Sequence, residues 1–419
     1  MNRIVNIFLV TIFIGGGSHI TAQTGDYQFS RPLNQVRTTG WHKIEIEKPV
    51  LAKINDDFSD IRILKVRDGD TTEVPYLIHK QEDETTLEDL AFRVVNQSTN
   101  KDESFVTIRN EEEKVINRIE LDISPRNYDV EATLEGSQNR IKWFTIKEGI
   151  RLVGIANDHV SFHFSTLNVK DVDYRFFRVK LSDPEVTVNQ ATIHHYSSTD
   201  GNYQDFPIED WKAVNNTDQK VTEIEIILKE RAPVNRVELS IGTSKDYYRP
   251  AQVQYLKQTV ETENGDKEIW RDFADFTVNS IEPALVESTL RFTEKLKITI
   301  QNFDDLPLPI QAVRVSGPVY HLLADLEAES EYMMVYENPT ARSPQYDLVY
   351  FQDKIPQDLV PAYLGDETEL ISEEEKESKA EGGSSIFADF GLWGLMLLAV
   401  LVLGFFTLKL MKKEGSEKE

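Results

Sequence analysis

The heptapeptide VINRIEL at residues 115–121 returns as PVNRVEL at residues 233–239. Asn117 matches Asn235 at an offset of 118 residues (235 − 117), and later pairs of motifs, FFRVKL with EKLKITI and QATIHHY with IQAVRVSG, lie at offsets of 119 and 120. An offset that is this constant and longer than a solenoid period predicts two copies of one β-domain.

The hydrophobic pattern around the motif is duplicated as well. Val106 and Ile108 alternate with polar residues, and Ile224 and Ile226 repeat them at an offset of 118 (224 − 106). A period of two is typical of half-buried strands. The apolar positions in and after each motif are predicted to lie in the core by the same argument. They are Ile119, Leu121 and Ile123 in the first copy and Val237, Leu239 and Ile241 in the second.

Short strands, frequent turns and the absence of a helical period predict an all-β chain of tandem β-sandwiches or jelly rolls. An N-terminal β-unit precedes the two copies, and one C-terminal transmembrane helix follows them. The expected organisation is a signal peptide at 1–22, the N-terminal β-unit at 23–100, sandwich repeats at 101–200 and 218–321, a closing β-hairpin at 322–364, an acidic linker at 365–385, the transmembrane helix at 386–408 and a cytoplasmic tail at 409–419.

The regions that flank the repeats carry weaker signals. Strands are expected in WHKIEIEKPV from Trp41, IRILKV from Ile61 and VPYLI from Val74, with Ile44, Ile46, Ile61 and Ile63 facing inward. The polar stretch from 81 to 100 is expected to be a loop with at most one helical turn. YMMVY from Tyr332 and DLVYF from Asp347 are expected to be extended and to form the closing hairpin, packed near the N-terminal unit.

Both ends of the chain indicate export. Arg3, an apolar run over 4–14 and Ala22 before Gln23 form the pattern of a secretory signal, and the run is short for a membrane helix. Residues 390–408 are 19 uncharged residues (408 − 390 + 1) followed by lysines at 409, 412 and 413. Such a segment is long enough to cross a bilayer, and the positive-inside rule places the short tail in the cytoplasm.

Composition excludes two classes of protein. A net charge of −25 argues against a nucleic-acid partner, because binding to phosphates requires a basic surface. The absence of cysteine rules out a disulfide framework and a lipid-bearing cysteine. The 419 residues, of which 40% are hydrophobic, must therefore build their cores by packing alone.

Two resemblances follow from these motifs. The order of an NR(I/V)EL strand, a polar turn before a tryptophan, a strand with alternating basic residues and a closing strand resembles the galactose-binding (discoidin-type) jelly roll, with copies at 104–196 and 221–321. The whole chain is similar to the bacterial domain-of-unknown-function 3999 family in its stretches Asp60–Ile78 and Tyr332–Leu348. This second resemblance implies an envelope protein with one membrane helix and leaves its activity open.

Aromatic residues at the ends of hairpins are the candidate ligand-binding residues. They are Trp143 and Trp270, which follow matched polar turns, and Tyr247, Tyr248 and Arg249 in KDYYRP. Sugar rings stack on aromatic side chains, and arginine supplies paired donors. The alternative for the two tryptophans is that both fill the sandwich cores. Their offset of 127 (270 − 143) also predicts a longer hairpin in the second copy.

No catalytic residue, metal site or cofactor is assigned. His159 and His163 would lie too far apart on a strand to hold one zinc ion, and calcium remains open at the Asp-rich turns 56–57, 68–70 and 304–305. Because 71 acidic residues produce chance pairs, their number alone does not indicate a glycosidase.

The sequence therefore predicts a non-catalytic, single-pass protein of the inner membrane with its bulk in the periplasm. The expected role is binding of an envelope glycan or an exported ligand. Two alternatives stay open, namely a structural or scaffold subunit of a membrane protein complex and an unrecognised polysaccharide hydrolase.

Overall fold

The computed structural model describes residues 26–67, 70–157, 161–263 and 265–370. The expected signal peptide, transmembrane helix and cytoplasmic tail lie outside these residues, as does most of the expected linker. Within them, no helix combines the length and the apolar character that crossing a bilayer requires. The chain divides into a first unit (1–79, 230–233 and 320–419) and a second unit (80–229 and 234–319), which are described separately.

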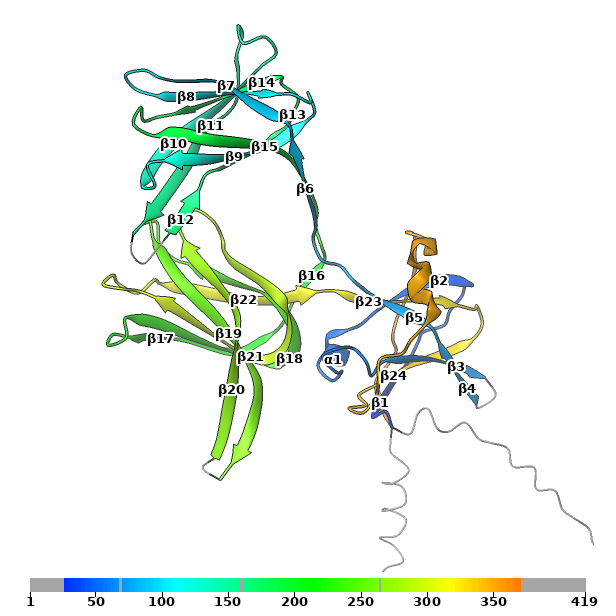
Figure 1. The fold of residues 1–419 in the computed structure, drawn as a ribbon. Coiled ribbons are helices and arrows are strands. Elements are labelled where there is room, and N and C mark those ends of the chain that lie inside the picture. Colours follow the sequence, from blue (N-terminus) through cyan, green and yellow to red (C-terminus); the bar gives the residue numbers. More distant parts are fainter. Residues whose placement is uncertain (1–25, 68–69, 158–160, 264, 371–419) are drawn as a thin grey trace, which may run out of the picture. The chain divides into compact units, whose positions relative to one another are not determined.

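The first unit is built from two sheets in which strands from the N-terminal and C-terminal parts of the chain pair with one another (Figure 1). The strand orders are β26-β1-β24-β3-β4 and β25-β2-β23-β5. The strands are β1 (Phe29–Pro32), β2 (Gly40–Glu45), β3 (Arg62–Arg67), β4 (Asp70–Val74), β5 (Tyr76–Lys80), β23 (Tyr320–Leu326), β24 (Glu331–Tyr336), β25 (Val360–Ala362) and β26 (Thr368–Glu369).

The alternating isoleucines of this unit behave as expected. Ile44, Ile46, Ile61 and Ile63 are all fully buried, which confirms the inward face predicted for them. The strand expected over 41–50 is shorter than predicted, because Pro49 and its neighbours form a short helix, α1 (Lys48–Leu51), at its end.

The closing hairpin expected at 322–364, between YMMVY and DLVYF, is wrong. YMMVY is strand β24, which pairs with β1 and β3 and not with DLVYF. Strand β23 lies in the other sheet, where it pairs with β2. Both strands are buried over most of their length, so their hydrophobic runs fit central positions in a sheet better than an added surface hairpin.

DLVYF is not extended either. It lies in a 3₁₀ helix, η1 (Asp347–Lys354), in which no residue is buried. Further along the chain, the expected acidic linker begins inside the fold, because β26 pairs with β1 and Leu370 N–H donates to the Gln28 carbonyl at 2.6 Å.

In the second unit, residues 84–199 form an antiparallel sandwich, here called sandwich 1. Its sheets have the orders β12-β11-β10-β14-β8-β7 and β13-β9-β15-β6. The strands are β6 (Glu84–Leu90), β7 (Phe92–Thr99), β8 (Ser104–Asn110), β9 (Ile116–Ser124), β10 (Tyr128–Ser137), β11 (Phe144–Ala156), β12 (Ser161–Phe164), β13 (Thr166–Val172), β14 (Phe176–Leu181) and β15 (Thr187–Thr199).

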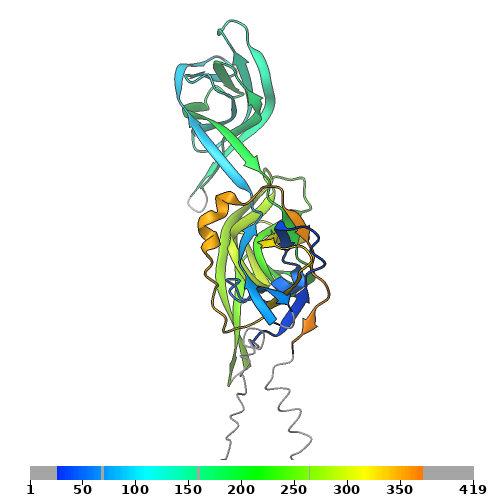
Figure 2. The same ribbon diagram turned by 90° about the vertical axis from the view of Figure 1, so that its right-hand side faces the viewer.

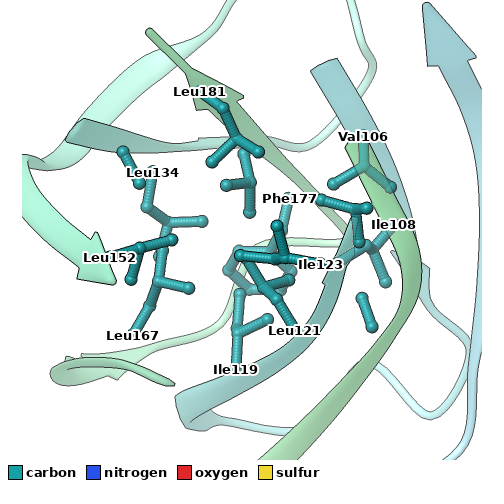
Figure 3. Packing of buried hydrophobic residues seen from close by; sticks show 14 of the residues in the cluster. Val106, Ile108, Ile119, Leu121, Ile123, Leu134, Leu152, Leu167, Phe177 and Leu181 are labelled. Atoms are coloured by element: carbon teal, nitrogen blue, oxygen red, sulfur yellow. The ribbon is translucent and has the colours of Figure 1, made fainter. Parts of the chain in front are cut away.

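The core of sandwich 1 consists of the residues that the alternation selects. Val106 and Ile108 on β8 meet Ile119, Leu121 and Ile123 on β9, and each is at most 7% exposed (Figure 3). Viewed after a turn of 90°, the strands curve around this core (Figure 2). With no disulfide to help, burial of these side chains at about 25 cal/mol per Å² is the main stabilising term.

Residues 203–318 form one continuous seven-stranded sheet, here called sandwich 2, with the strand order β16-β22-β18-β21-β19-β20 and with β17 paired to β18. Its strands are β16 (Tyr203–Asp205), β17 (Ile208–Asn216), β18 (Val221–Ile241), β19 (Tyr248–Thr262), β20 (Gly265–Asn279), β21 (Ala284–Gln301) and β22 (Ile310–Pro318). Ile224, Ile226, Val237 and Leu239 are buried as predicted, whereas Ile241 is half-buried.

The two sandwiches share one topology. The first half of β18 pairs with β17 as β8 pairs with β7, and its second half pairs with β22 as β9 pairs with β15. The single strand β18 thus corresponds to two strands of sandwich 1, β8 and β9. This correspondence is what duplication of one β-domain predicts.

The expected loop at 81–100 is wrong, because β6 and β7 occupy it and lie at edges of the two sheets of sandwich 1. Six of the seven residues of β6 are exposed, so the strand carries a polar sequence without a buried alternating face. Sandwich 1 therefore begins earlier than residue 101. Sandwich 2 likewise begins earlier than residue 218, with β16 and β17.

Candidate functional site

Tyr247, Tyr248 and Arg249 line a cavity of about 280 Å³ in the second unit, here called the Tyr247 cavity. The other residues that line it come from β11, β12 and the turns of sandwich 2. They are Arg151, Val153, Ile155, Phe162, Asp246, Asn279, Ser280, Ile281 and Asp305. Three of the five candidate residues chosen from the sequence are thus brought together at one concave site.

Backbone pairing and turn hydrogen bonds fix the sandwich 2 part of the cavity. Tyr248 is the first residue of β19 and pairs with Asn279, the last residue of β20. Asn279 Oδ1 accepts the backbone N–H groups of Ile281 and Glu282, each at 2.9 Å, which closes the turn after β20. Ser280 N–H donates to the Tyr247 carbonyl at 3.2 Å and ties the two turns together.

Arg249 is held in place beneath the cavity. Its side chain is 11% exposed, its Nη2 lies 2.9 Å from Asp305 Oδ2, and its Nη1 donates to the Tyr248 carbonyl at 2.9 Å. The Nε of Arg249 is buried and has no protein acceptor. A buried donor without a partner costs free energy.

A second ionic group stands on the wall that comes from β11. Arg151 donates to both carboxylate oxygens of Asp246, at 3.0 and 2.8 Å, and to both of Asp129, at 2.8 and 2.7 Å. These hydrogen bonds hold the pKa of the Asp246 carboxyl below its usual value, and Ser280 Oγ–H adds to the effect. Arg151 lowers the pKa of Asp129 in the same way. Both carboxylates are therefore ionised and paired at neutral pH.

The remaining wall is aromatic and aliphatic. The rings of Phe162 and Tyr248 lie with centroids 5.0 Å apart and tilted by 54°. Tyr247 is half-buried, and burial raises the pKa of its phenol. A site of this kind combines an apolar face with ordered donors and acceptors.

The structure places the other two candidates elsewhere. Trp143 and Trp270 do not line the Tyr247 cavity, and neither fills a core, because both are half-buried. Arg178 lies 4.2 Å from the centroid of Trp143 and Lys297 lies 4.4 Å from that of Trp270. The two cations are 119 residues apart (297 − 178), so the cation–π pair is duplicated with the repeat.

Each cation sits between two buried residues of its strand, which places the pair on the outer face of its sheet. Because one face of each indole is covered by a cation, these tryptophans are poorer sugar platforms than the aromatic wall of the Tyr247 cavity.

No group of three or more histidine or acidic residues suited to a metal ion occurs in the described part of the chain. His163 is exposed, and His159 lies outside the described residues. At the turn considered for calcium, Asp304 pairs with Lys220 and Asp305 with Arg249.

Sequence reasoning missed several residues that line the cavity. Asp246 adjoins the aromatic pair and could have been included with it. Arg151 and Phe162 are about 90 residues away in the chain, and only the fold brings them to Tyr248.

No protein-family model matches this sequence, and a search of curated proteins gives no match. Among solved structures, the chain is similar to the CBM32-1 and CBM32-2 domains of Clostridium perfringens ZmpB in complex with GalNAc, at 6% identity over 61% of this chain and 92% of that one, with a TM-score of 0.21. It is similar to a putative α-L-fucosidase from Bacteroides ovatus at 11% identity over 57% of this chain and 39% of that one, with a TM-score of 0.19.

A third similarity is to a fucolectin (F-lectin) from the serum of striped bass, Morone saxatilis, at 8% identity over 59% of this chain and 99% of that one, with a TM-score of 0.17. Overlap this low says nothing about what the present chain binds.

Proposed function

We propose that this protein is a non-catalytic envelope protein whose exported sandwiches bind a glycan at the Tyr247 cavity. The observation that carries the proposal is the composition of the cavity, in which the Phe162 and Tyr248 rings stand beside two ordered arginine–carboxylate pairs. A sugar offers C–H faces for stacking and hydroxyl groups that both donate and accept hydrogen bonds. Both kinds of contact are available there.

The location remains the one expected from the sequence. A signal peptide at 1–22 would export the chain, and a helix at 386–408 would anchor it in the inner membrane with the sandwiches in the periplasm. We also propose that the sandwiches are galactose-binding-like jelly rolls and that the chain belongs to the domain-of-unknown-function 3999 family. The duplicated strand order supports the first proposal, and the stretches Asp60–Ile78 and Tyr332–Leu348 support the second.

The test is binding of the purified full chain to a glycan array, followed by titration of the strongest ligand. Tyr248→Ala and Arg249→Ala should each weaken binding by roughly tenfold or more, which corresponds to about 1.4 kcal/mol of binding free energy. Trp143→Ala and Trp270→Ala are the matched controls, because they remove aromatic side chains of the same sandwiches outside the cavity. A glycan signal that survives both cavity variants would remove the site.

A second candidate, a structural subunit that docks another membrane protein, is favoured by one observation in the first unit. Tyr350 on η1 is 82% exposed, and its neighbours Val349 and Phe351 on the same short helix are also exposed. Exposed apolar residues grouped in this way are typical of interaction surfaces. Recovery of a stable partner after affinity purification from detergent, lost on Tyr350→Ser, would favour this role over the first.

A further inference from the structure

We infer that the Tyr247 cavity takes one uncharged sugar ring at the end of a glycan chain, and that both sandwiches are needed to hold it. This rests on the proposed glycan-binding function and goes beyond it in naming the class of sugar and the origin of the site. Three properties of the cavity carry it, namely its size, its balanced charges and the origin of its walls.

The first property is size. The cavity measures about 280 Å³, whereas sites for drug-sized ligands span about 300–1,000 Å³. A ring in the interior of a polysaccharide has neighbours on both sides and needs an open groove with further subsites. A volume just below this range fits one ring, which is most easily presented at the end of a chain.

The second property is charge. The lining holds two arginines and two aspartates, and both arginines are paired. Arg151 pairs with Asp246 and, outside the lining, with Asp129, and Arg249 pairs with Asp305. A uronic acid would have to displace a carboxylate from its arginine, and an amino sugar would have to displace an arginine from its carboxylate. Neither exchange gains a new ion pair.

The electrostatic field of the whole chain also favours an uncharged ligand over an acidic one. With a net charge of −25, the protein repels an acidic polysaccharide before contact. An uncharged ring avoids this repulsion. Its hydroxyl groups can donate to the exposed carboxylates of Asp246 and Asp305, while its C–H face lies on the aromatic wall.

The third property is the origin of the walls. Arg151 and Phe162 belong to sandwich 1, whereas Tyr248, Asp246 and Arg249 belong to sandwich 2. Contacts between the two sets are the bidentate pair of Arg151 with Asp246 and the ring contact of Phe162 with Tyr248. Duplication of the β-domain thus produces a site that neither copy contains alone.

The experiment is calorimetric titration of the purified full chain, kept in detergent, with defined saccharides. The probes are galactose, glucose, mannose, fucose and N-acetylgalactosamine, the acidic galacturonate and glucuronate, the cationic glucosamine, and oligosaccharides that end in the best ring. At least one neutral ring should bind. Its acidic or cationic counterpart should bind at least tenfold more weakly, chain extension should change the affinity less than threefold, and raising NaCl from 50 to 500 mM should change it less than twofold.

The requirement for both sandwiches is tested by Arg151→Ala and Phe162→Ala. Each should weaken binding of the best neutral ring at least tenfold, although the changes lie in sandwich 1 and most of the cavity lies in sandwich 2. Arg175→Ala is the matched control, because Arg175 is an exposed, ion-paired arginine of sandwich 1 outside the cavity, and it should leave binding unchanged.

The outcomes separate the two levels of the proposal. Tighter binding of a uronate or of glucosamine, or affinity that rises tenfold with each added residue, would overturn the choice of ligand and leave glycan binding intact. Full binding by Arg151→Ala and Phe162→Ala would overturn the role of sandwich 1. If no saccharide binds at all, the proposed function itself fails, and the inference falls with it.

Discussion

The same dipeptide, Asn-Arg, stands at equivalent positions of the two sandwiches and does different work in each. In sandwich 1, Asn117 binds the backbone of Tyr196 twice, accepting from its N–H and donating to its carbonyl, both at 2.7 Å. The following Arg118 pairs locally with Glu120 and is 29% exposed. Here the asparagine links two strands by hydrogen bonds, and the arginine contributes only a local, partly exposed ion pair.

In sandwich 2 the roles are reversed. Asn235 is buried, but its side-chain oxygen has no hydrogen-bond partner. Arg236 is only 15% exposed, pairs with Asp83 and Glu287, and stacks over Tyr203 with its guanidinium carbon 3.3 Å from the ring centroid.

The segments that Arg236 holds are those through which the chain passes into and out of sandwich 1. Asp83 also accepts the N–H of Gly201 at 2.6 Å, and the Gln81 carbonyl accepts that of Asn202 at 2.8 Å. Gly201 lies so close to this segment that a Cβ atom there would stand 2.5 Å from the Gln81 carbonyl oxygen. The comparison teaches that duplication preserves a strand and its register, while the neighbours of the strand decide what each side chain does.

The largest expected effect is the difference in stability loss between variants of the two arginines. Arg236→Ala removes two ion pairs and a stacking contact at a mostly buried position, and should lower the free energy of unfolding by about 2 kcal/mol. Arg118→Ala removes an exposed local pair and should cost about 0.5 kcal/mol or less. Urea unfolding of the two variants beside the parent measures both values. Equal losses would show that the two arginines are equivalent after all.

The next effect concerns the asparagines and runs in the opposite order. Asn117→Ala leaves the N–H and carbonyl of Tyr196 without their side-chain partner and should cost about 1.5 kcal/mol. Asn235→Ala removes an oxygen that has no hydrogen bond, and should cost less than about 0.5 kcal/mol. Thermal melting of the pair decides the matter, and a larger drop in Tm for Asn235→Ala would contradict the assignment.

The smallest effect concerns Arg151, the side chain of sandwich 1 that pairs with a carboxylate of each sandwich. Because Arg151 lowers the pKa of both Asp129 and Asp246, these groups stay ionised above the ordinary aspartate range near pH 4. The contribution of these two carboxylates to the free energy of unfolding is present above that range. It is lost as the pH falls through their lowered pKa values. Affinity for a neutral saccharide should therefore be flat between about pH 5 and about pH 9. A titration step near pH 6 or 7 would mean that another group controls the cavity.

Part of the candidate site could be predicted from local sequence. Tyr247, Tyr248 and Arg249 are consecutive, and the sequence pattern predicted that they lie together at the end of a hairpin. The remaining lining residues depend on where β11 and β12 come to lie, which no local pattern encodes. The tryptophans show the reverse failure, because their matched positions suggested either a ligand platform or a core residue, and each instead lies under a cation on the outer face of a sheet.

The sequence by itself determined the duplication, the buried faces of the strands and the location of the two cores. Alternation with period two is a local property, since successive side chains of a strand point to opposite sides. Only the tertiary structure decided that strands from both ends of the chain share the sheets of the first unit, and that edge strands replace the polar loop at 81–100. It also decided that Arg151 and Phe162 face Tyr248. Pairing between distant segments depends on complementary partners, and neither partner carries that information alone.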